Sequence, residues 1–339
     1  MQTFAPMRER RDPQLASKNI FDLIRAELDL VEDEFERQAS SNIQVIDYLG
    51  EYLRSSGGKR VRPALLILAN YAVGGSGNGG NVIRLATVME MLHTATLVHD
   101  DIIDNADLRR SRASVNSRFG NQTAVLMGDW LYMSAFETTV KERSLEIIDI
   151  LTRLTRKMTE GELIQLTRIG RLDISESEYF DILRRKTAFL FSACCEVGGI
   201  LGGAAKAEQD ALRDYGMELG IAFQLSDDIL DLTAETESLG KAAGSDLLEG
   251  KLTLPLIYLL EKEPALKPKL EKIMFDGEYS ALSRDDLKET LIKHGILAAI
   301  KERADDYAGR ARKSLDVLSE SEYRSCLEDV LAFVIERNK

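Results

Sequence analysis

Two short acidic stretches decide the fold: Asp100-Asp101-Ile102-Ile103-Asp104 and Asp227-Asp228-Ile229-Leu230-Asp231. Each carries carboxylates at positions i, i+1 and i+4, and each follows an apolar run, Thr94 to Val98 for the first and Ile221 to Leu225 for the second. Residues four apart share one face of a helix, so the first and last aspartates of each motif stand one above the other. The spacing therefore predicts two helices that present paired carboxylates.

The paired carboxylates indicate a metal site. Like charges stacked on a helix are destabilising unless a cation lies between them. Mg²⁺ prefers a few hard oxygen ligands and completes its shell with waters and substrate phosphates. A solvated acidic helix face is the alternative for one motif, but two copies with the same spacing favour metal binding. The candidate metal ligands are Asp100, Asp101, Asp104, Asp227, Asp228 and Asp231.

The composition narrows the class of protein. The chain has 339 residues, of which 44% are apolar and only 6% aromatic, so its core is built mainly from Leu, Ile, Ala and Val, which favours helices. A formal net charge of −12 argues against nucleic acid as a partner. Three cysteines without metal-ligand spacing are typical of a reduced intracellular protein. With no signal peptide or long apolar run evident, we expect a cytoplasmic protein with no transmembrane segment.

Apolar residues recur at helical spacing along nearly the whole chain. Residues 1–17 are polar and are expected to form a flexible N-terminal tail. Helices are predicted from Ser17 to about Val31 and over 43–54, 64–71, 82–104, 121–139, 145–165, 176–201, 205–232, 252–260, 283–294, 296–318 and 322–337. Alternating patterns are nearly absent, so we expect no sheet. The prediction is one all-α domain over residues 18–339.

Basic side chains stand out against this acidic background. The segment Gly57-Gly58-Lys59-Arg60-Val61-Arg62-Pro63 places three cations at the start of a helix, where free backbone N–H groups favour an anion. His93 lies seven residues before Asp100 on roughly the same helix face, and Arg109 and Arg110 follow the first motif. Taken separately, an exposed basic turn and a structural histidine remain alternatives.

The second half repeats the pairing of acids with bases. Lys186-Thr187 falls in an otherwise apolar helix, where an unpaired lysine is costly to bury. A glycine-rich segment, 240–251, follows the second motif and contains Lys241 and Lys251. Its end is a near miss for a Walker loop, because Leu252 stands where Ser or Thr is needed, which argues against an NTPase.

Taken together, these acidic and basic residues suit a site that binds two phosphorylated substrates. Two carboxylate clusters face scattered Lys, Arg and His donors, and no nucleophile has an evident base. Metal-assisted departure of a diphosphate fits such a set, because the ions stabilise the leaving charge without a covalent intermediate.

From about Ile20 to the C-terminus the chain resembles the trans-isoprenyl diphosphate (polyprenyl) synthases. The motifs that carry the resemblance are GGKRVRP, HTATLVHDDIID with ADLRR, EGELIQL, RRKTAFLF, FQLSDDILD and GKAAGSDLLEGKLTLP. One departure is Ser111, where the family usually has Gly after the arginine pair. The resemblance implies a helical bundle around a deep central cavity, a homodimer, and Mg²⁺ as the cofactor, with about three ions per active site.

The resemblance also assigns roles to individual residues. Those implied for isopentenyl diphosphate are Lys59, Arg62, His93 and Arg110. Those implied for the allylic diphosphate are Arg109, Lys186, Thr187, Gln224, Lys241 and Lys251. The implied catalytic set is Asp100, Asp101, Asp104, Arg109, Lys186, Asp227 and Asp228, and Asp231 is a further metal ligand. The implied reaction is ionisation, condensation and elimination, with apolar walls that keep water from the cation.

The helix before the first motif predicts the product length. Ala95 and Thr96 precede Asp100 by five and four residues, which places them roughly 6 to 8 Å down the helix from the metals. A bulky aromatic residue there would form a floor, and short-chain members of the family commonly have one. We therefore expect a long product of the octaprenyl, solanesyl or heptaprenyl type. The alternative is that Ala95 is small only to let helices pack closely.

Other functions remain open at this stage. A farnesyl or geranylgeranyl diphosphate synthase is the closest alternative, and only the residues near Ala95 speak against it. A partner subunit of a heteromeric synthase would show gaps in its motifs, and none is evident. A terpene cyclase would not need Lys59, Arg62 and Arg110 for a second diphosphate. The sequence does not say how many condensations occur or which allylic primer is preferred. It also leaves open whether the protein is a homodimer or a heteromer, and whether the product is delivered directly to a membrane.

Overall fold

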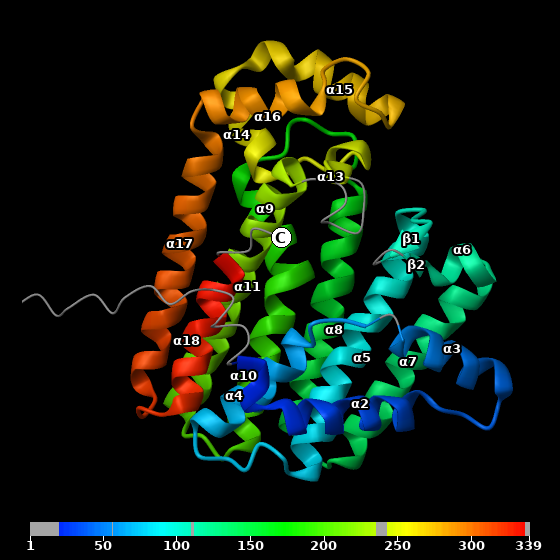
Figure 1. Cartoon of the computed structure of the whole chain (residues 1–339), viewed down its shortest axis with the longest axis vertical. Helices are drawn as coiled ribbons and strands as arrows, with labels where there is room; N and C mark the ends of the chain where they lie inside the picture. The colour runs from blue at the N-terminus through cyan, green and yellow to red at the C-terminus, as the bar shows by residue number, and fades with distance from the viewer. Residues whose placement is uncertain (1–19, 56, 110–111, 235–242, 336–339) are drawn as a thin grey trace, which may run out of the picture.

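The computed structural model describes residues 20–55, 57–109, 112–234 and 243–335, and these form a helical bundle (Figure 1). The longer helices are α2 (Arg25–Ala39), α3 (Gln44–Arg54), α4 (Val61–Ala72), α5 (Gly80–Ile103), α7 (Asn121–Lys141), α8 (Leu145–Leu166), α9 (Glu176–Leu183), α10 (Phe189–Leu201), α11 (Lys206–Thr233), α14 (Leu254–Lys262), α15 (Lys267–Asp276), α16 (Arg284–Lys293), α17 (Ile296–Ser314) and α18 (Glu322–Ile335). The short elements are β1 (Leu108–Arg109), β2 (Arg112–Ala113), α6 (Val115–Phe119), the π-helical turn η1 (Arg184–Ala188), α13 (Ser245–Leu248) and the 3₁₀ turns η2 (Pro264–Leu266) and η3 (Leu315–Val317). The predicted all-α class is confirmed.

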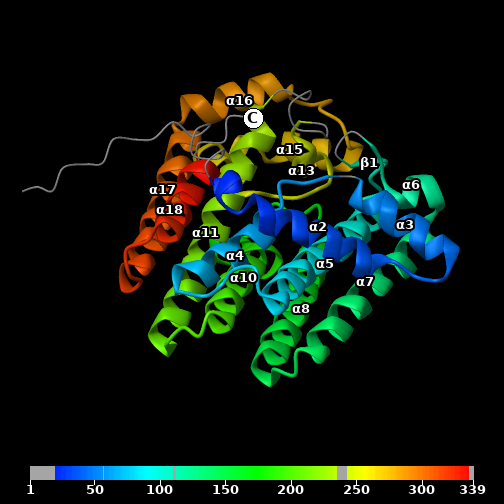
Figure 2. The same cartoon turned by 60° about the horizontal axis from the view of Figure 1, so that its bottom comes forward.

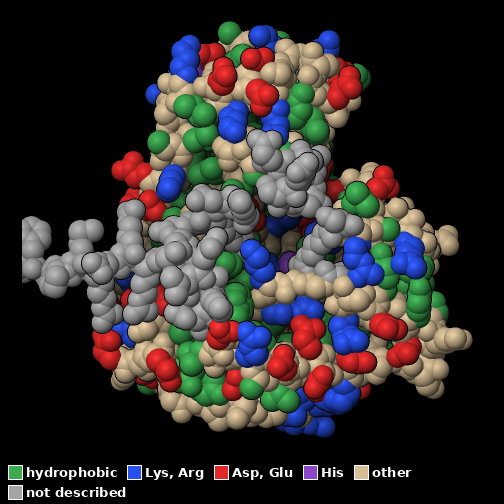
Figure 3. Space-filling view, in the orientation of Figure 1, with side chains coloured by type: hydrophobic (Ala, Val, Ile, Leu, Met, Phe, Trp, Pro, Cys, Tyr) green, Lys and Arg blue, Asp and Glu red, His purple; other side chains and the backbone are tan. Residues whose placement is uncertain are grey.

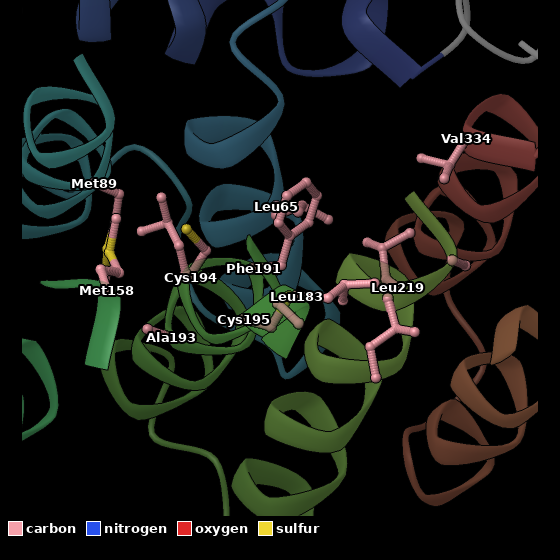
Figure 4. Close-up of a cluster of buried hydrophobic side chains, with 14 of the residues drawn as sticks. Leu65, Met89, Met158, Leu183, Phe191, Ala193, Cys194, Cys195, Leu219 and Val334 are labelled. Atoms are coloured by element: carbon pink, nitrogen blue, oxygen red, sulfur yellow. The ribbon is translucent and has the colours of Figure 1, made fainter. Parts of the chain in front are cut away.

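Helices α4, α5, α10 and α11 form the centre of the bundle. α10 packs against both α4 and α11, and α5 packs against α4 and α7. The stretch 64–70 of α4 is entirely buried, which explains why it has no charged face. Figures 1 and 2 show α7 and α8 on one side of this centre and α17 and α18 on the other. Figure 4 shows the resulting core, with side chains from different helices in one cluster, among them Leu65, Met89, Met158, Phe191 and Leu219.

The predicted helix boundaries agree with the structure where the local signals are strong. Ser144 accepts a hydrogen bond from the Ile147 backbone N–H at the start of α8, and Ser175 forms a capping box with Glu178 at the start of α9. The first predicted helix, from Ser17 to about Val31, is helical at 20–23 and again from Arg25, and α2 continues beyond the predicted end to Ala39. α15 was not predicted.

Two expectations about local structure are wrong. The stretch 176–201, predicted as one helix, is divided by the π-helical turn η1, whose five residues include Lys186. The expectation of no sheet fails at one place, because β1 and β2 form an antiparallel pair with Leu108 opposite Ala113. Strands of two residues are too short to show an alternating pattern, so no pattern of residues predicts them.

The helices α13 to α16 cover one end of the bundle (Figure 1). Arg284 on α16 donates to the backbone carbonyl of Ala234, and Lys288 Nζ donates to the carbonyl of Thr233 at 3.0 Å. Both cations therefore neutralise the C-terminal end of α11, where unpaired carbonyls and the helix dipole favour positive charge.

Three expectations concern the chain as a whole. No helix in the described part of the chain combines the length and apolar character needed to cross a bilayer. Cys194, Cys195 and Cys326 are buried and form no disulfide in the described part of the chain. The predicted tail, residues 1–17, lies outside the described residues, so the domain boundaries stay a prediction.

Glycines allow the central helices to approach closely. A Cβ added at Gly216 on α11 would lie 2.6 Å from the backbone oxygen of Phe191 on α10, and one at Gly198 on α10 would lie 2.3 Å from the backbone oxygen of Leu66 on α4. Both distances are far below van der Waals contact, and backbone atoms cannot rotate aside. Any side chain at these positions must push the helices apart.

We predict that Gly216→Ala lowers the free energy of unfolding by about 2 kcal/mol, because the added methyl group overpacks the contact between α10 and α11. Gly309→Ala is the matched control, since no atom lies within 4 Å of its added Cβ on α17, and it should stabilise the helix by about 0.5 to 1 kcal/mol. Urea unfolding followed by circular dichroism measures both. Equal midpoints for Gly216→Ala and the wild type would contradict the packing argument.

Candidate active site

A cavity of about 880 Å³ lies among α4, α5, α8, η1 and α11. Figure 3 shows the surface hollowed between the upper helices and the body of the bundle, with Lys and Arg side chains at its edge. Both acidic motifs reach this cavity. One face of α5 supplies Glu90, His93, Leu97, Asp100 and Asp104, which follow one another at intervals of three, four, three and four residues.

The first acidic motif is divided between two environments. Asp100 and Asp104 line the cavity, whereas Asp101, one position further round the helix, is buried and does not appear among the described lining residues. Asp101 instead accepts a hydrogen bond from Arg109 Nε at 2.6 Å. Arg109 itself lines the cavity, so this ion pair fixes the arginine at its edge.

Lys251 connects the two halves of the site. Its Nζ lies 3.1 Å from both carboxylate oxygens of Asp104 and 2.6 Å from Glu249 Oε2. Burial lowers the pKa of Lys251, but the attraction of Glu249 and Asp104 outweighs this effect and leaves the pKa above its ordinary value. The lysine is therefore a fixed positive charge at the first acidic motif.

In the second acidic motif the first two aspartates line the cavity, whereas in the first motif the first and the last do so. Asp227 and Asp228 line it, and Asp228 accepts hydrogen bonds from Tyr179 Oη at 2.6 Å and from Gln224 Nε2 at 3.0 Å. Asp231 is buried behind them and is not among the described residues that line the cavity. Its carboxylate accepts from Ser245 Oγ and from the Asp246 backbone N–H, each at 3.3 Å. Asp231 therefore binds the first turn of α13.

Keeping these buried carboxyl groups ionised costs free energy. Burial raises the pKa of Asp100 to about 6, against the opposing attraction of Lys186. Burial, with repulsion from Asp246, raises the pKa of Asp228 to about 8. A divalent cation would relieve this cost, because it favours the ionised form of each group.

The oxygen ligands in the cavity are of the kind that Mg²⁺ prefers, but they do not complete its coordination shell by themselves. Asp100, Asp104, Asp227 and Asp228 supply hard oxygens, the ligands that Mg²⁺ prefers. Within the described residues, no three or more acidic, histidine or cysteine side chains lie close enough together to hold an ion by themselves. Oxygens from a bound diphosphate and waters would have to complete the shell.

Lys186 and Thr187 reach the cavity from the π-helical turn. Lys186 Nζ lies 2.5 Å from Glu162 Oε2 and 2.5 Å from Gln165 Oε1, both on α8. Thr187 Oγ1 donates to Gln224 Oε1 at 3.0 Å. Gly161 lets α8 approach this turn, since an added Cβ would lie 2.6 Å from Arg185 Cβ. The extra residue in a π turn shifts the following side chains, a device common at functional sites.

Three other predicted substrate-binding residues also line the cavity. Lys59, Arg62 and His93, predicted for one diphosphate, line it from the start of α4 and from α5. Arg110 and Lys241 lie outside the described residues. The structure thus places every other predicted substrate-binding residue in the cavity lining, whereas Asp101 and Asp231 lie behind the lining.

Several cavity residues were not named from the sequence. Gln165 belongs to the EGELIQL motif, and Asp246 belongs to the GKAAGSDLLEG motif, so a signal existed for both. Glu90, Arg168 and Tyr179 also line the cavity, but each lies in an ordinary helical or loop pattern that gave no signal.

The remaining wall is apolar. It includes Leu97, Met158, Ile182, Leu190 and Phe223. Of the two residues predicted to set product length, Thr96 lines the cavity, and Ala95 is fully buried and absent from the described lining.

An all-α bundle whose cavity joins two aspartate-rich motifs, opposed cations and an apolar wall defines the class of isoprenoid synthases. Comparison with known families gives the particular one. Residues 43–290 match the family model described as polyprenyl synthetase, and the chain belongs to this family of prenyltransferases. The resemblance seen in the sequence is confirmed.

Relatives with different products are about equally similar. The octaprenyl diphosphate synthase of Escherichia coli (strain K12) is 37% identical over 302 residues, covering 89% of this chain and 93% of the relative. The geranylgeranyl diphosphate synthase of Methanosarcina mazei is 38% identical over 291 residues, covering 84% and 88%.

The fold is also found in solved structures. A polyprenyl synthase from Caulobacter crescentus CB15, crystallised with calcium and isoprenyl diphosphate, superposes with a TM-score of 0.88 at 36% identity. The superposition covers 95% of this chain and 98% of that one. This agreement confirms the predicted all-α isoprenoid synthase fold.

The contacts of Asp231 predict an asymmetry between two aspartates of one motif. Asp231→Asn keeps an oxygen that can accept the Asp246 N–H, so product formation should fall less than about threefold and the Mg²⁺ requirement should not change. Asp227→Asn removes a charge from the cavity lining and should cost about a hundredfold or more in turnover. Initial rates over a range of Mg²⁺ concentrations test both variants. A marked rise in the Mg²⁺ requirement of Asp231→Asn would mean that this side chain is a metal ligand.

Proposed function

We propose that this protein is a Mg²⁺-dependent prenyltransferase that condenses isopentenyl diphosphate onto an allylic diphosphate and makes a long-chain trans-polyprenyl diphosphate. One observation carries the proposal. Carboxylates of both acidic motifs, two groups of cations and an apolar wall all line the same cavity. A site for two diphosphates and a hydrocarbon chain needs these three parts.

Asp100, Asp104, Asp227 and Asp228 would hold the Mg²⁺ ions, about three by family resemblance. When bound, such ions supply positive charge that stabilises a departing diphosphate. The burial that raises the carboxylate pKa values also excludes water, so each electrostatic contact acts in a medium of lower dielectric constant.

The cations divide into two sets. Lys59, Arg62 and His93, with Arg110, would bind isopentenyl diphosphate. The set for the allylic diphosphate would be Arg109, Lys186, Thr187, Gln224, Lys241 and Lys251. Support comes from the ion pairs that already hold Lys186 and Lys251 in place, because a fixed cation loses little entropy on binding phosphate.

In the proposed reaction the allylic C–O bond breaks and both electrons leave with the diphosphate. The π electrons of isopentenyl diphosphate then form the new C–C bond, and a proton is lost to the released diphosphate. The oxygen dipoles of Thr187 and Gln224 would stabilise the developing positive charge, and Leu190 and Phe223 would keep water from it.

We place the reaction in the cytoplasm. The support is that Cys194, Cys195 and Cys326 form no disulfide among the described residues, as expected in a reducing compartment.

The proposal of a long product depends on the part of the cavity wall near Thr96. Its side chain lines the cavity, and α5 carries no Phe, Tyr or Trp; Leu97 and His93 are the neighbouring lining residues. Because Ala95 is buried among helices, its small size is also explained by packing. Thr96 is therefore the better position at which to test the floor.

We predict that the wild-type protein, given Mg²⁺, farnesyl diphosphate and labelled isopentenyl diphosphate, makes a long polyprenyl product. Thr96→Phe should shorten it, because an aromatic ring would fill the space into which the chain grows. Chromatography of the dephosphorylated products measures the length.

Thr96→Val is the matched control, since it keeps the size of the side chain and should leave the length unchanged. A wild-type product of three or four isoprene units would contradict the long-chain proposal and support a geranylgeranyl-type enzyme. No product from folded protein would contradict the enzymatic proposal and favour a partner subunit.

We also propose that the protein is a homodimer formed through an apolar surface on α7 and α8. Leu126, Met133 and Val140 are exposed at intervals of seven residues along α7, so they form one stripe. Leu145 and Leu163 on α8 are also exposed. The opposite side of α7 packs on α5, which leaves this stripe for a second copy in a two-fold arrangement.

We predict a sedimentation mass of twice the 37.9 kDa chain. The double variant Leu126→Glu with Met133→Glu should sediment as a monomer, because like charges would meet at the proposed two-fold interface. Phe275→Glu is the control, since Phe275 is 90% exposed on α15, away from α7. A monomeric wild type would contradict the dimer.

A further inference from the structure

Arg60 has an unusual backbone conformation at the edge of the cavity. Its φ of 49° lies in the left-handed region, which side chains larger than glycine rarely adopt. Arg60 directly precedes α4, in the turn that begins with Gly57 and Gly58. Such a conformation persists only when surrounding contacts hold it.

Those contacts are two carboxylates from two other helices. Arg60 Nη1 donates to Glu90 Oε1 on α5 at 2.9 Å, and Nη2 donates to Glu32 Oε2 on α2 at 3.0 Å. Arg60 Nε donates to the second oxygen of Glu32. The Arg60 and Glu90 side chains are only 12% and 5% exposed, so this pair is largely shielded from solvent screening, whereas the Glu32 side chain is 33% exposed.

Arg60 and Glu90 line the cavity themselves, and so do residues beside Arg60 in the chain. Lys59 and Arg62 both line it, and each lies near an aromatic ring, with Lys59 Nζ 5.2 Å from the centre of Phe333 and Arg62 Cζ 5.1 Å from that of Phe191. The directions of both side chains depend on the backbone at Arg60. A change of φ there would turn Lys59 relative to Arg62 and α4.

We propose that Glu32 and Glu90 are positioning residues for isopentenyl diphosphate. Acting through Arg60, they hold the turn in the conformation that directs Lys59 and Arg62 into the cavity. This inference rests on the proposed function, which assigns those two cations to isopentenyl diphosphate. Arginine suits the role because its planar fork can bind two carboxylates at once, whereas lysine presents a single point charge.

Simple electrostatics predicts the opposite effect on binding. Glu32 and Glu90 add negative charge near a site for an anion, so removing one charge without moving the turn should tighten diphosphate binding. If the turn depends on the carboxylates, their removal should weaken binding. The sign of the change in KM therefore distinguishes positioning from a plain charge effect.

The test compares Glu32→Gln and Arg60→Lys with the wild type. Glu32→Gln should raise KM for isopentenyl diphosphate about tenfold while kcat and the KM for farnesyl diphosphate change less than about twofold. Arg60→Lys should raise the same KM further. Because Arg60→Lys leaves Glu90 buried with a weaker partner and can impair folding, Glu32→Gln is the deciding variant.

Glu142→Gln is the matched control. Glu142 forms an ion pair with Arg84, which lies six residues before Glu90 on α5, and its side chain is 12% exposed, but neither residue lines the cavity in the described part of the chain. This variant should lower the melting temperature about as much as Glu32→Gln and leave both KM values unchanged.

Calorimetric binding of isopentenyl diphosphate to the whole protein tests the same point without turnover. A wild type that binds it but makes no product would contradict the proposed reaction, and weaker binding by Glu32→Gln would still support the positioning role. Unchanged or tighter binding by Glu32→Gln, or equal rises in both KM values, would overturn the positioning role. Absence of binding by the wild type would overturn both proposals.

Discussion

The structure depends on holding several carboxylates close together in a cavity partly shielded from water. Burial raises the pKa of Asp100 to about 6 and that of Asp228 to about 8, so both groups are held against their preference for solvent. Local partners offset part of this cost: Lys251 pairs with Asp104, and Tyr179 and Gln224 donate to Asp228. The bundle must therefore keep α5, α9, α11 and the α13–α14 segment in fixed relation. The close glycine contacts of α10 with α11 and with α4 fix α11 within the centre of the bundle.

We expect these charged groups to exchange their present partners for metal ions and phosphate oxygens when substrate binds. In the proposed reaction each aspartate would gain a metal ion and each lysine a phosphate oxygen, so the Asp104–Lys251 pair would be replaced by two new charge pairs. Each charged group therefore keeps a partner of opposite charge while a diphosphate enters between them. A cavity lined by free carboxylates would instead hold like charges together with nothing to compensate them.

Patterns local in the sequence predicted most of the helices. Features that depend on contacts between distant segments could not be predicted in this way. The helical period of the apolar residues predicted most helices, but the π-helical turn at Lys186 needs an extra residue per turn that no residue type marks. The two acidic motifs have the same spacing, yet Asp104 lines the cavity and Asp231 does not, because α13 binds Asp231. Tyr179 could not be predicted, since only the packing of α9 on the neighbouring helices brings it to Asp228.

Product length depends on local geometry more than on overall similarity. An octaprenyl synthase and a geranylgeranyl synthase are 37% and 38% identical to this chain, so identity does not separate the two products. Both kinds of enzyme would share the charged half of the cavity, where the same diphosphates bind. The difference must lie in the apolar wall, where the chain grows. In this protein Thr96, Leu97, Met158 and Leu190 form part of that wall without an aromatic floor on α5. Side chains of this size on neighbouring helices leave the hydrocarbon free to extend, which is the physical basis of the long-chain proposal.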